Sequence, residues 1–332
     1  MTALPPEMSV WTCRRYGGPE QLALERRPVP TPGPGEVVLR IHATTVSSAD
    51  VRLRTLVLPR GFGLIGRAVI GFRGPRKSVL GTECSGTVAT VGADVTAFAP
   101  GDAVFAFPGS ALGCHAEYRV MPADGRIARK PDTLSHAQAA SLCFGATTAL
   151  HFLHKARLRA GDHLLVIGAS GAVGSAMVQI GQAMGAVVTA VTSAANADLV
   201  QSLGAHRVID YHRQDHETLP DRYDIIADTV AASSFARSLR VLNPNGRYLS
   251  VAGGLGDLLA RPRGSRRSIG GPADEKPEHI AKIARMAEAG TLRPVIDSIH
   301  AFADLPAAHA RAETGRKRGS VVVSLIRGGS AD

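Results

Sequence analysis

Hydrophobic residues in the middle of the chain follow the pattern of a buried strand, a glycine-rich turn and a helix. Residues 164–167 are all apolar, which suits a parallel strand buried on both faces. Apolar side chains then recur at spacings of four, three and four, on one face of a helix: Val173, Met177, Ile180 and Met184. Gly185 ends this helix, and a second strand is expected at 187–192. The order predicts one βαβ unit.

The same alternation continues downstream. Strand candidates recur as follows: 164–168, 187–192, 207–210, 224–228 and 247–252. Helices are expected between them. Sequential βα units of this kind predict an α/β fold with a doubly wound, mostly parallel sheet covered on both faces.

The two ends of the chain read differently. The first third is mostly β, with strands expected at 36–44, 81–95 and 101–107, and a helix at 135–156 leads into the central unit. Residues 262–277 hold three prolines and three glycines, which predicts a loop or domain boundary. The tail resumes as helix and strand in alternation: 279–289, 294–300, 304–313 and 320–326.

Residues 54–77 combine apolar side chains with arginines, several glycines and Pro59. This composition is compatible with a membrane-surface element. Glycine and proline interrupt a long amphipathic helix, however, so we favour a flexible flap over an apolar cleft.

The spacing of the glycines in the central turn has a functional interpretation. Gly168, Gly171 and Gly174 stand three apart between the strand and the helix. Such glycines allow a sharp turn, a close approach of a pyrophosphate to the main chain and tight helix–strand packing, with the phosphates at the positive helix end. Glycine also collects in turns for purely steric reasons. The surrounding strand–turn–helix order favours a dinucleotide site.

Composition narrows the class of protein. A chain of 332 residues is expected to form two domains, and 45% hydrophobic with 20% charged residues is ordinary for a globular protein. Residues 1–6 lack a signal-peptide pattern, and no apolar run approaches the roughly 20 residues of a membrane-spanning helix, so we expect a cytoplasmic protein. The four cysteines form no C-x-x-C pair, which argues against a disulfide framework or a structural zinc lobe.

The formal net charge of +10 raises the possibility of a nucleic-acid partner. The basic residues are spread along the chain, with denser patches at 261–267 and 316–318. We therefore interpret them as a solvated basic surface that attracts an anionic cofactor, and nucleic acid is not the expected partner.

Several motifs together resemble the medium-chain dehydrogenase/reductase superfamily, in its zinc-free quinone oxidoreductase (zeta-crystallin-like) branch. They are found at 33–36 (GPGE), 81–83 (GTE) with Gly86 and Gly92, 100–102 (PGD), 168–174 (GASGAVG), 204–205 (GA), 209–211 (IDY) and 316–319 (RKRG). The resemblance implies a GroES-like β-rich catalytic domain, residues 1–140 plus 277–332. A Rossmann cofactor domain, residues 141–276, is inserted between these parts, and a homodimer is implied.

Two positions depart from the zinc-dependent members of this superfamily. Ser47 stands where those members have a cysteine, and Thr82 where they have a histidine. Hydroxyls are poor substitutes for thiolate and imidazole, so we expect no zinc and no other metal. Without a Lewis acid, easily reduced acceptors such as quinones and α,β-unsaturated carbonyls are expected. The resemblance makes Ser47 and Thr148 catalytic candidates; the alternative is a helix N-cap and a helix-interior threonine.

The strand after the glycine turn bears on the cofactor. No Asp or Glu lies between Asp162 and Asp198, whereas a site that prefers NADH places an acid about 20 residues after the turn. NADPH is therefore expected over NADH, with Tyr211 or residues 316–318 compensating for the absent local base. The predicted cofactor contacts are Gly168, Ser170, Gly171, Ala172, Val173, Gly174, Thr192, Ser193, Tyr211, Ala252, Gly253 and Arg318.

The function expected is NADPH-dependent, zinc-independent hydride transfer to a quinone or α,β-unsaturated carbonyl. Two alternatives stay open. One is an enoyl-thioester reductase of a biosynthetic pathway, which the same fold supports. The other is a non-catalytic protein that binds the cofactor or nucleic acid.

Overall fold

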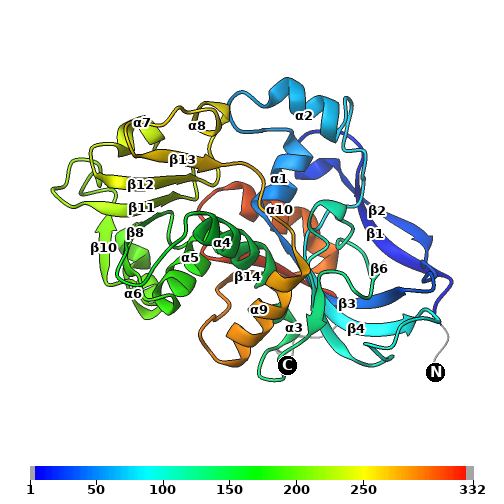
Figure 1. Cartoon of the computed structure of the whole chain (residues 1–332). Coiled ribbons are helices and arrows are strands. Elements are labelled where there is room, and N and C mark those ends of the chain that lie inside the picture. Colours follow the sequence, from blue (N-terminus) through cyan, green and yellow to red (C-terminus); the bar gives the residue numbers. More distant parts are fainter. Residues whose placement is uncertain (1–3, 327–332) are drawn as a thin grey trace.

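Two large β-sheets with helices packed on them make up the computed structural model, which describes residues 4–326 (Figure 1). Residues 1–3 and 327–332, which the expected catalytic domain includes at its two ends, lie outside the described residues. One sheet is parallel and comes from the middle of the chain; the other is largely antiparallel and comes from both ends.

The parallel sheet has the strand order β10-β9-β8-β11-β12-β13, and all its neighbours run parallel. Its strands are β8 (His163–Ile167), β9 (Val187–Thr192), β10 (Arg207–Asp210), β11 (Tyr223–Asp228), β12 (Leu242–Ser250) and β13 (Arg267–Gly270). The first five confirm the predicted strands to within a few residues. This is the doubly wound order in which a ligand crevice forms where the direction of winding reverses, between β8 and β11.

Three expectations for this half were wrong. Residues 262–277 were expected to be a loop or a domain boundary, and the loop alternative was wrong at Arg267–Gly270, which form β13, an edge strand that pairs with β12 alone. Residues 211–222, all described, form turns instead of a helix between β10 and β11. The helix expected at 135–156 is two helices, because the chain turns at Ser141 and Leu142.

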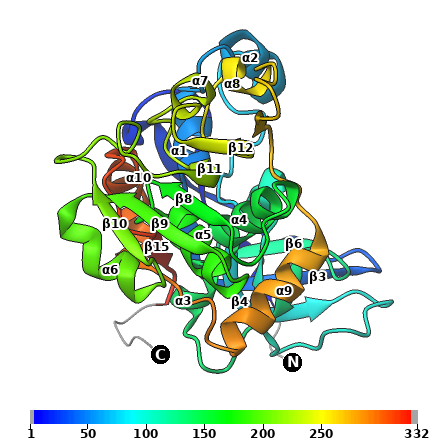
Figure 2. The same ribbon diagram turned by 60° about the vertical axis from the view of Figure 1, so that its left-hand side comes forward.

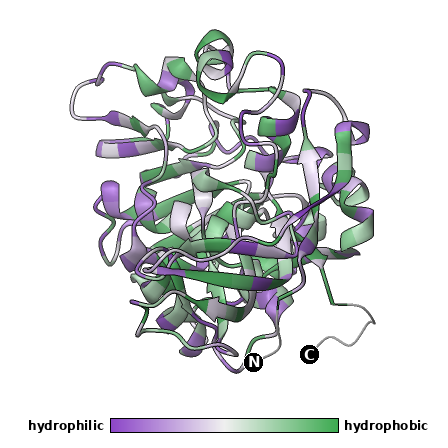
Figure 3. Cartoon of the chain, turned by 90° about the vertical axis from the view of Figure 1, so that its right-hand side faces the viewer, coloured by the Kyte–Doolittle hydropathy of each residue, from purple (hydrophilic) through white to green (hydrophobic). Residues whose placement is uncertain are grey.

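The helices of this half cover the parallel sheet from both sides, except α3 (His136–Ala140), which packs on the antiparallel sheet (Figures 1 and 2). The others are α4 (Cys143–Lys155), α5 (Ala172–Ala183), α6 (Ala197–Ser202), α7 (Phe235–Ser238), α8 (Leu255–Leu258) and α9 (Pro277–Glu288). Apolar side chains of α4, α5 and α9 share one core with the strands, and α7 packs on a second core beneath the opposite face. Figure 3 shows the apolar colour concentrated in the strands that cross the molecule.

The second sheet has the order β14-β15-β3-β4-β5-β7, with β6 also paired to β3. Its strands are β3 (Glu36–Val46), β4 (Cys84–Val91), β5 (Ala103–Ala106), β6 (Tyr118–Pro122), β7 (Ile127–Arg129), β14 (Ile296–Ala301) and β15 (Ser320–Ser324). A separate pair, β1 (Glu7–Cys13) and β2 (Leu22–Pro28), is antiparallel. The helices here are α1 (Ser48–Thr55), α2 (Gly63–Ile70) and α10 (Leu305–Glu313).

The two sheets meet at the glycine turn. The main-chain N–H of Gly319, just before β15, donates to the carbonyl oxygen of Ser170 at 2.8 Å. Gly171 and Gly319 also form an isolated parallel bridge. The C-terminal strand of the antiparallel sheet therefore begins directly beside the turn that follows β8.

Candidate active site

The turn between β8 and α5 has the backbone conformation that its glycines allow. Gly168 adopts φ +79°, a left-handed conformation that side chains other than glycine rarely adopt. A Cβ on Gly174 would lie 2.1 Å from the carbonyl oxygen of Gly168, so only glycine lets α5 approach the strand this closely. The free N–H groups of the first turn of α5, which begins at Ala172, consequently face the end of the strand.

A groove of about 930 Å³ opens at this turn, across the carboxyl ends of β8, β9 and β10. Half of the predicted cofactor residues line it: Gly168, Ser170, Gly171, Thr192, Ser193 and Tyr211. The other six are not among its lining residues. Ala172, Val173 and Gly174 start α5 behind the turn, and Ala252 and Gly253 follow β12. Arg318 is exposed and donates to the carbonyl oxygen of Ala195.

Hydroxyl and amide groups occupy the end of β9. The hydroxyl of Thr192 donates to Ser170 Oγ at 3.0 Å, and Nδ2 of Asn196 donates to the same oxygen at 3.1 Å. Asn196 also donates to Ser193 Oγ at 3.2 Å. The strand end is thus polar without being acidic. Asp215, from the turns after β10, supplies a half-exposed carboxylate to the groove lining, which spacing after the glycine turn could not reveal.

The opposite wall of the groove is basic. Arg316 and Lys317 line it from the segment before β15. Burial lowers the pKa of Lys317 to about 8, although nearby Glu83 opposes that shift. Sequence reasoning singled out the 316–318 cluster and named Arg318. Three consecutive basic residues carry no signal for which of them face inward, and the fold places Arg316 and Lys317 in the groove wall.

A second cavity, of about 600 Å³, lies among α1, α2, the 107–112 loop and the start of α4. Its walls are largely apolar, with side chains from four segments: Leu53, Ile70, Phe107, Leu112 and Phe144. Thr82 also lines this cavity, and it is 4% exposed. The Thr82 hydroxyl is buried and has no hydrogen-bond partner among residues 4–326. An unpaired buried hydroxyl on an apolar cavity is suited to bind a polar group of a ligand.

The loop that carries Thr82 is held by a buried carboxylate. Asp50 accepts the main-chain N–H of Gly81 at 2.8 Å with one oxygen. With the other it accepts the N–H of Ser47 at 2.8 Å and the hydroxyl of Ser47 at 2.6 Å. Ser47 is the N-cap of α1 and forms a capping box with Asp50.

The two residues expected near the nicotinamide are engaged within their own elements. The Ser47 hydroxyl serves the capping box, and the Thr148 hydroxyl donates to the carbonyl oxygen of Phe144 at 2.8 Å within α4. These are the contacts of the alternative interpretation, an N-cap and a helix-interior threonine. Thr82, which was predicted only as a replaced metal ligand, lines the cavity, and its buried hydroxyl has no partner among the described residues.

Glu83 lies between the cavity and the groove. Its carboxylate accepts the hydroxyl of Thr45 at 2.5 Å and the N–H of Phe144 at 2.6 Å. Burial raises the pKa of Glu83 to about 7, and the positive charge of Lys317 partly offsets this. Glu83, which follows Thr82 in the chain, therefore interacts electrostatically with Lys317 in the basic wall of the groove.

The donor set does not suit a zinc ion. Ser47 and Thr82 offer hydroxyls, and the Ser47 hydroxyl is already bonded to Asp50. Within residues 4–326, no cluster of three or more His, Cys, Asp or Glu side chains could hold a metal ion. All four cysteines are buried and unpaired in this part of the chain.

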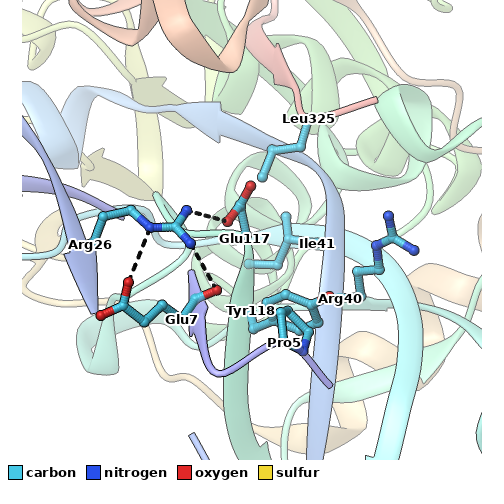
Figure 4. A pocket seen from close by; sticks show the side chains of 8 residues that line it. All are labelled: Pro5, Glu7, Arg26, Arg40, Ile41, Glu117, Tyr118 and Leu325. Carbon is cyan, nitrogen blue, oxygen red and sulfur yellow. Dashed lines mark hydrogen bonds and ion pairs between the residues drawn. The ribbon is translucent and has the colours of Figure 1, made fainter. Parts of the chain in front are cut away.

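A smaller hollow of about 260 Å³ lies elsewhere, between the N-terminal strands and β6 (Figure 4). Its charged side chains pair with one another: Arg26 lies 3.6 Å from Glu7 and 4.0 Å from Glu117. No residue of this hollow lines the groove or the larger cavity. It is therefore not part of the candidate active site.

Comparison with known families agrees with this geometry. Residues 33–132 match the alcohol dehydrogenase GroES-like domain, and residues 203–323 match the zinc-binding dehydrogenase family. The chain is 30% identical to a 2-methylene-furan-3-one reductase of Solanum lycopersicum over 98% of its own length and 81% of the relative's. The chain belongs to the medium-chain dehydrogenase/reductase superfamily. It is an oxidoreductase of the branch that includes quinone oxidoreductases and enone reductases.

Other members of the superfamily support the same placement. Mouse NAD(P)H oxidoreductase RTN4IP1, a mitochondrial protein, is 31% identical over 96% of this chain and 89% of the relative. The solved structure of the quinone oxidoreductase from Coxiella burnetii superposes with a TM-score of 0.84 at 27% identity, covering 96% of this chain and all of that one. The antiparallel sheet is accordingly the GroES-like part of the superfamily fold, and the parallel sheet is its Rossmann part.

Proposed function

We propose that this oxidoreductase uses NADPH to reduce a quinone or an α,β-unsaturated carbonyl without a metal ion. The observation that carries the proposal is the unpaired, buried hydroxyl of Thr82 on an apolar cavity beside a dinucleotide groove. Relatives named as enone and quinone reductases support the substrate class.

Residues of the glycine turn would hold the cofactor. The N–H groups that begin α5, with Gly168 and Gly171, suit the pyrophosphate, and Lys317 adds a positive charge to the same groove. When bound, the nicotinamide supplies the hydride. We assign the 2′-phosphate to the space bordered by Ser193, Tyr211 and Arg316, because β9 ends without a carboxylate.

The Thr82 hydroxyl would donate a hydrogen bond to the substrate oxygen as negative charge develops there. Its loop is held rigid by Asp50, so the donor is positioned before substrate arrives. The apolar walls of the cavity, Phe107 and Phe144 among them, would exclude water and strengthen that bond. A single hydroxyl donor suffices for acceptors that take hydride readily, and no metal is needed to polarise them.

The predicted domain division remains part of this proposal: a catalytic domain of residues 1–140 plus 277–332, and a cofactor domain of residues 141–276. A homodimer is also part of this proposal. Edge strand β13 pairs only with β12 and leaves one edge of the parallel sheet open to a second copy. The cytoplasmic location is also still a prediction, and relatives named as mitochondrial and chloroplastic show that the superfamily occupies several compartments.

The test is NADPH oxidation by purified protein after dialysis against a chelator, with quinones, enones and saturated aldehydes as acceptors. Turnover of quinones or enones, retained after chelation and faster than with saturated aldehydes, is the expected result. Activity that depends on added zinc would contradict the proposal. Preference for an enoyl thioester over both acceptors would favour the biosynthetic alternative.

A further inference from the structure

The segment 57–73 presents apolar side chains to solvent that no other part of the described chain covers. Helix α2 buries Gly66 alone. The exposed fractions of the apolar side chains along this segment are Val57 71%, Leu64 86%, Ile65 53%, Val69 67% and Phe72 69%. We call these five side chains the α2 surface. Contiguous exposed apolar side chains of this kind mark an interaction site more often than a free surface.

A helix forms here in spite of the glycines. The helix is short, eight residues, and Val69 and Ile70 line the apolar cavity, in keeping with the expected flap over an apolar cleft. Gly66 packs α2 against Leu58: a Cβ at Gly66 would lie 1.9 Å from Leu58 Cδ1. The segment is also tied down at both ends. The Tyr16 hydroxyl donates to the carbonyl oxygen of Gly71 at 2.7 Å, and the N–H of Leu255 donates to that of Arg60 at 2.9 Å. Figures 1 and 2 show α2 at the outer end of the molecule, beside α8.

The charges around the α2 surface are mostly positive, with Asp257 of the neighbouring helix α8 as an acidic exception. Residues 51–82 contain no Asp or Glu, and their exposed basic side chains are Arg60, Arg67, Arg73, Arg76 and Lys77. The adjoining stretch 258–273 adds four arginines and again no acid. Ion pairs among residues 4–326 do not include Arg60, Arg67 or Arg73. The positive charge is thus available to a partner.

We propose that the α2 surface docks on an anionic lipid membrane, with its apolar side chains in the interface and its arginines against the headgroups. Apolar side chains combined with uncompensated basic ones are what peripheral membrane elements use. A second copy of this chain fits less well, because apposed α2 surfaces would bring like charges together. In the described part of the chain no helix has the length and apolarity to cross a bilayer, so the contact would be peripheral.

The position of α2 gives this contact a consequence for substrate access. Val69 and Ile70 line the apolar cavity, whereas Leu64 and Ile65 do not. The cavity would therefore open at the membrane surface, where apolar acceptors accumulate. The docking itself does not depend on the proposed reaction and can be measured without any substrate.

The experiment is flotation of the purified full chain with lipid vesicles. Vesicles of phosphatidylcholine with a minority of phosphatidylglycerol should carry the protein, pure phosphatidylcholine vesicles should not, and added salt should release it. Leu64→Ser combined with Ile65→Ser should lower the partition coefficient about tenfold or more. Arg60→Gln combined with Arg73→Gln should lower it about fivefold per residue.

Matched controls are Leu24→Ser and Arg285→Gln, exposed residues of β2 and α9 away from the α2 surface. Both control variants should bind the anionic vesicles as strongly as the unaltered chain does. If the Leu64→Ser, Ile65→Ser variant fails to fold, the Arg60→Gln, Arg73→Gln variant still tests membrane binding by the α2 surface. Absence of binding to anionic vesicles, or equal binding by both double variants and the controls, would overturn the proposal. A dimer in gel filtration that Leu64→Ser with Ile65→Ser dissociates would show that a second copy covers this surface instead.

Discussion

The carboxylate of Asp50 accepts the main-chain N–H of Gly81 at 2.8 Å, which ties the first helix of the chain to the loop that carries Thr82. The same carboxylate caps α1 through Ser47. One buried side chain thus sets both the start of a helix and the position of the proposed hydrogen-bond donor.

Replacing Asp50 by Ala should destabilise the protein by about 3 kcal/mol, because buried N–H groups of Ser47 and Gly81 lose a charged acceptor. Urea unfolding measures this. Activity of the folded fraction should fall as well, since the Thr82 loop is no longer held. Asp124→Ala, at an exposed position, is the control and should change the free energy of unfolding by less than about 0.5 kcal/mol. A similar loss in both variants would contradict the structural role assigned to Asp50.

Replacing Thr82 by Val keeps the shape of the side chain and removes the donor. We expect kcat to fall by about 10- to 100-fold, somewhat less than the loss of a full oxyanion-hole donor, with the NADPH Kd unchanged. Thr148→Val removes a hydroxyl that is bonded to Phe144 and should have a much smaller effect. If instead Thr148→Val causes the large loss in kcat, the original assignment of Thr148 as the catalytic hydroxyl is the correct one.

Arg316→Gln should raise the KM for NADPH about tenfold and leave the KM for NADH unchanged, because only NADPH carries the 2′-phosphate. Steady-state kinetics with both cofactors measures this difference. Arg285→Gln, on the exposed face of α9, serves as the charge-matched control. A native preference for NADH would contradict both the assignment of Arg316 and the cofactor proposal.

The affinity for NADPH should depend on pH through Lys317. Burial places the pKa of Lys317 at about 8, below its ordinary value of 10.5, so the free protein loses this positive charge as the pH rises through 8. The NADPH Kd should then increase, by at most about tenfold per pH unit. Titration of the cofactor by fluorescence across this range tests it. Lys317→Gln should bind more weakly at pH 7 and show no such slope; a slope that persists in this variant would assign it to another group.

Stability should depend on pH through Glu83. Its pKa is raised from 4.5 to about 7, so between these values the folded protein holds a proton that the unfolded chain has lost. The stabilising contribution is complete below pH 4.5 and is lost as the pH rises to 7, an effect of up to about 3 kcal/mol. Glu83→Gln should remove this part of the slope in unfolding measurements. If the pH dependence of stability is the same in this variant, Glu83 is ionised in the folded protein throughout this pH range.

Local patterns predicted the parallel sheet well, because each of its central strands contains a short group of apolar residues. Edge strand β13 escaped prediction: Arg267–Gly270 is buried by one neighbour only and so has no apolar run. The break between α3 and α4 also lacked a signal, since the residues around Ser141 keep a helical pattern. Helix α2 was underestimated because its stability comes from packing on Leu58, which spacing along the chain does not reveal.

Some residues of the candidate site could likewise be predicted from the sequence, and others could not. The glycine turn could be identified because its function depends on backbone conformation, and that restricts the residue type at Gly168 and Gly174. The role of Ser47 as a helix cap was also predicted, as the alternative to a catalytic role. Which hydroxyl faces the cavity and which base faces the groove depends on tertiary placement, so Thr82 and Lys317 emerged only from the fold.

The hydrogen bond from Gly319 to Ser170 puts the phosphate site on the seam between the two sheets. A dinucleotide held there would touch residues of both and act as a removable cross-link between them. Without it we expect the GroES-like and Rossmann parts to melt less cooperatively. With it they are expected to melt together, which would make the heat-capacity trace of the protein a direct gauge of cofactor occupancy.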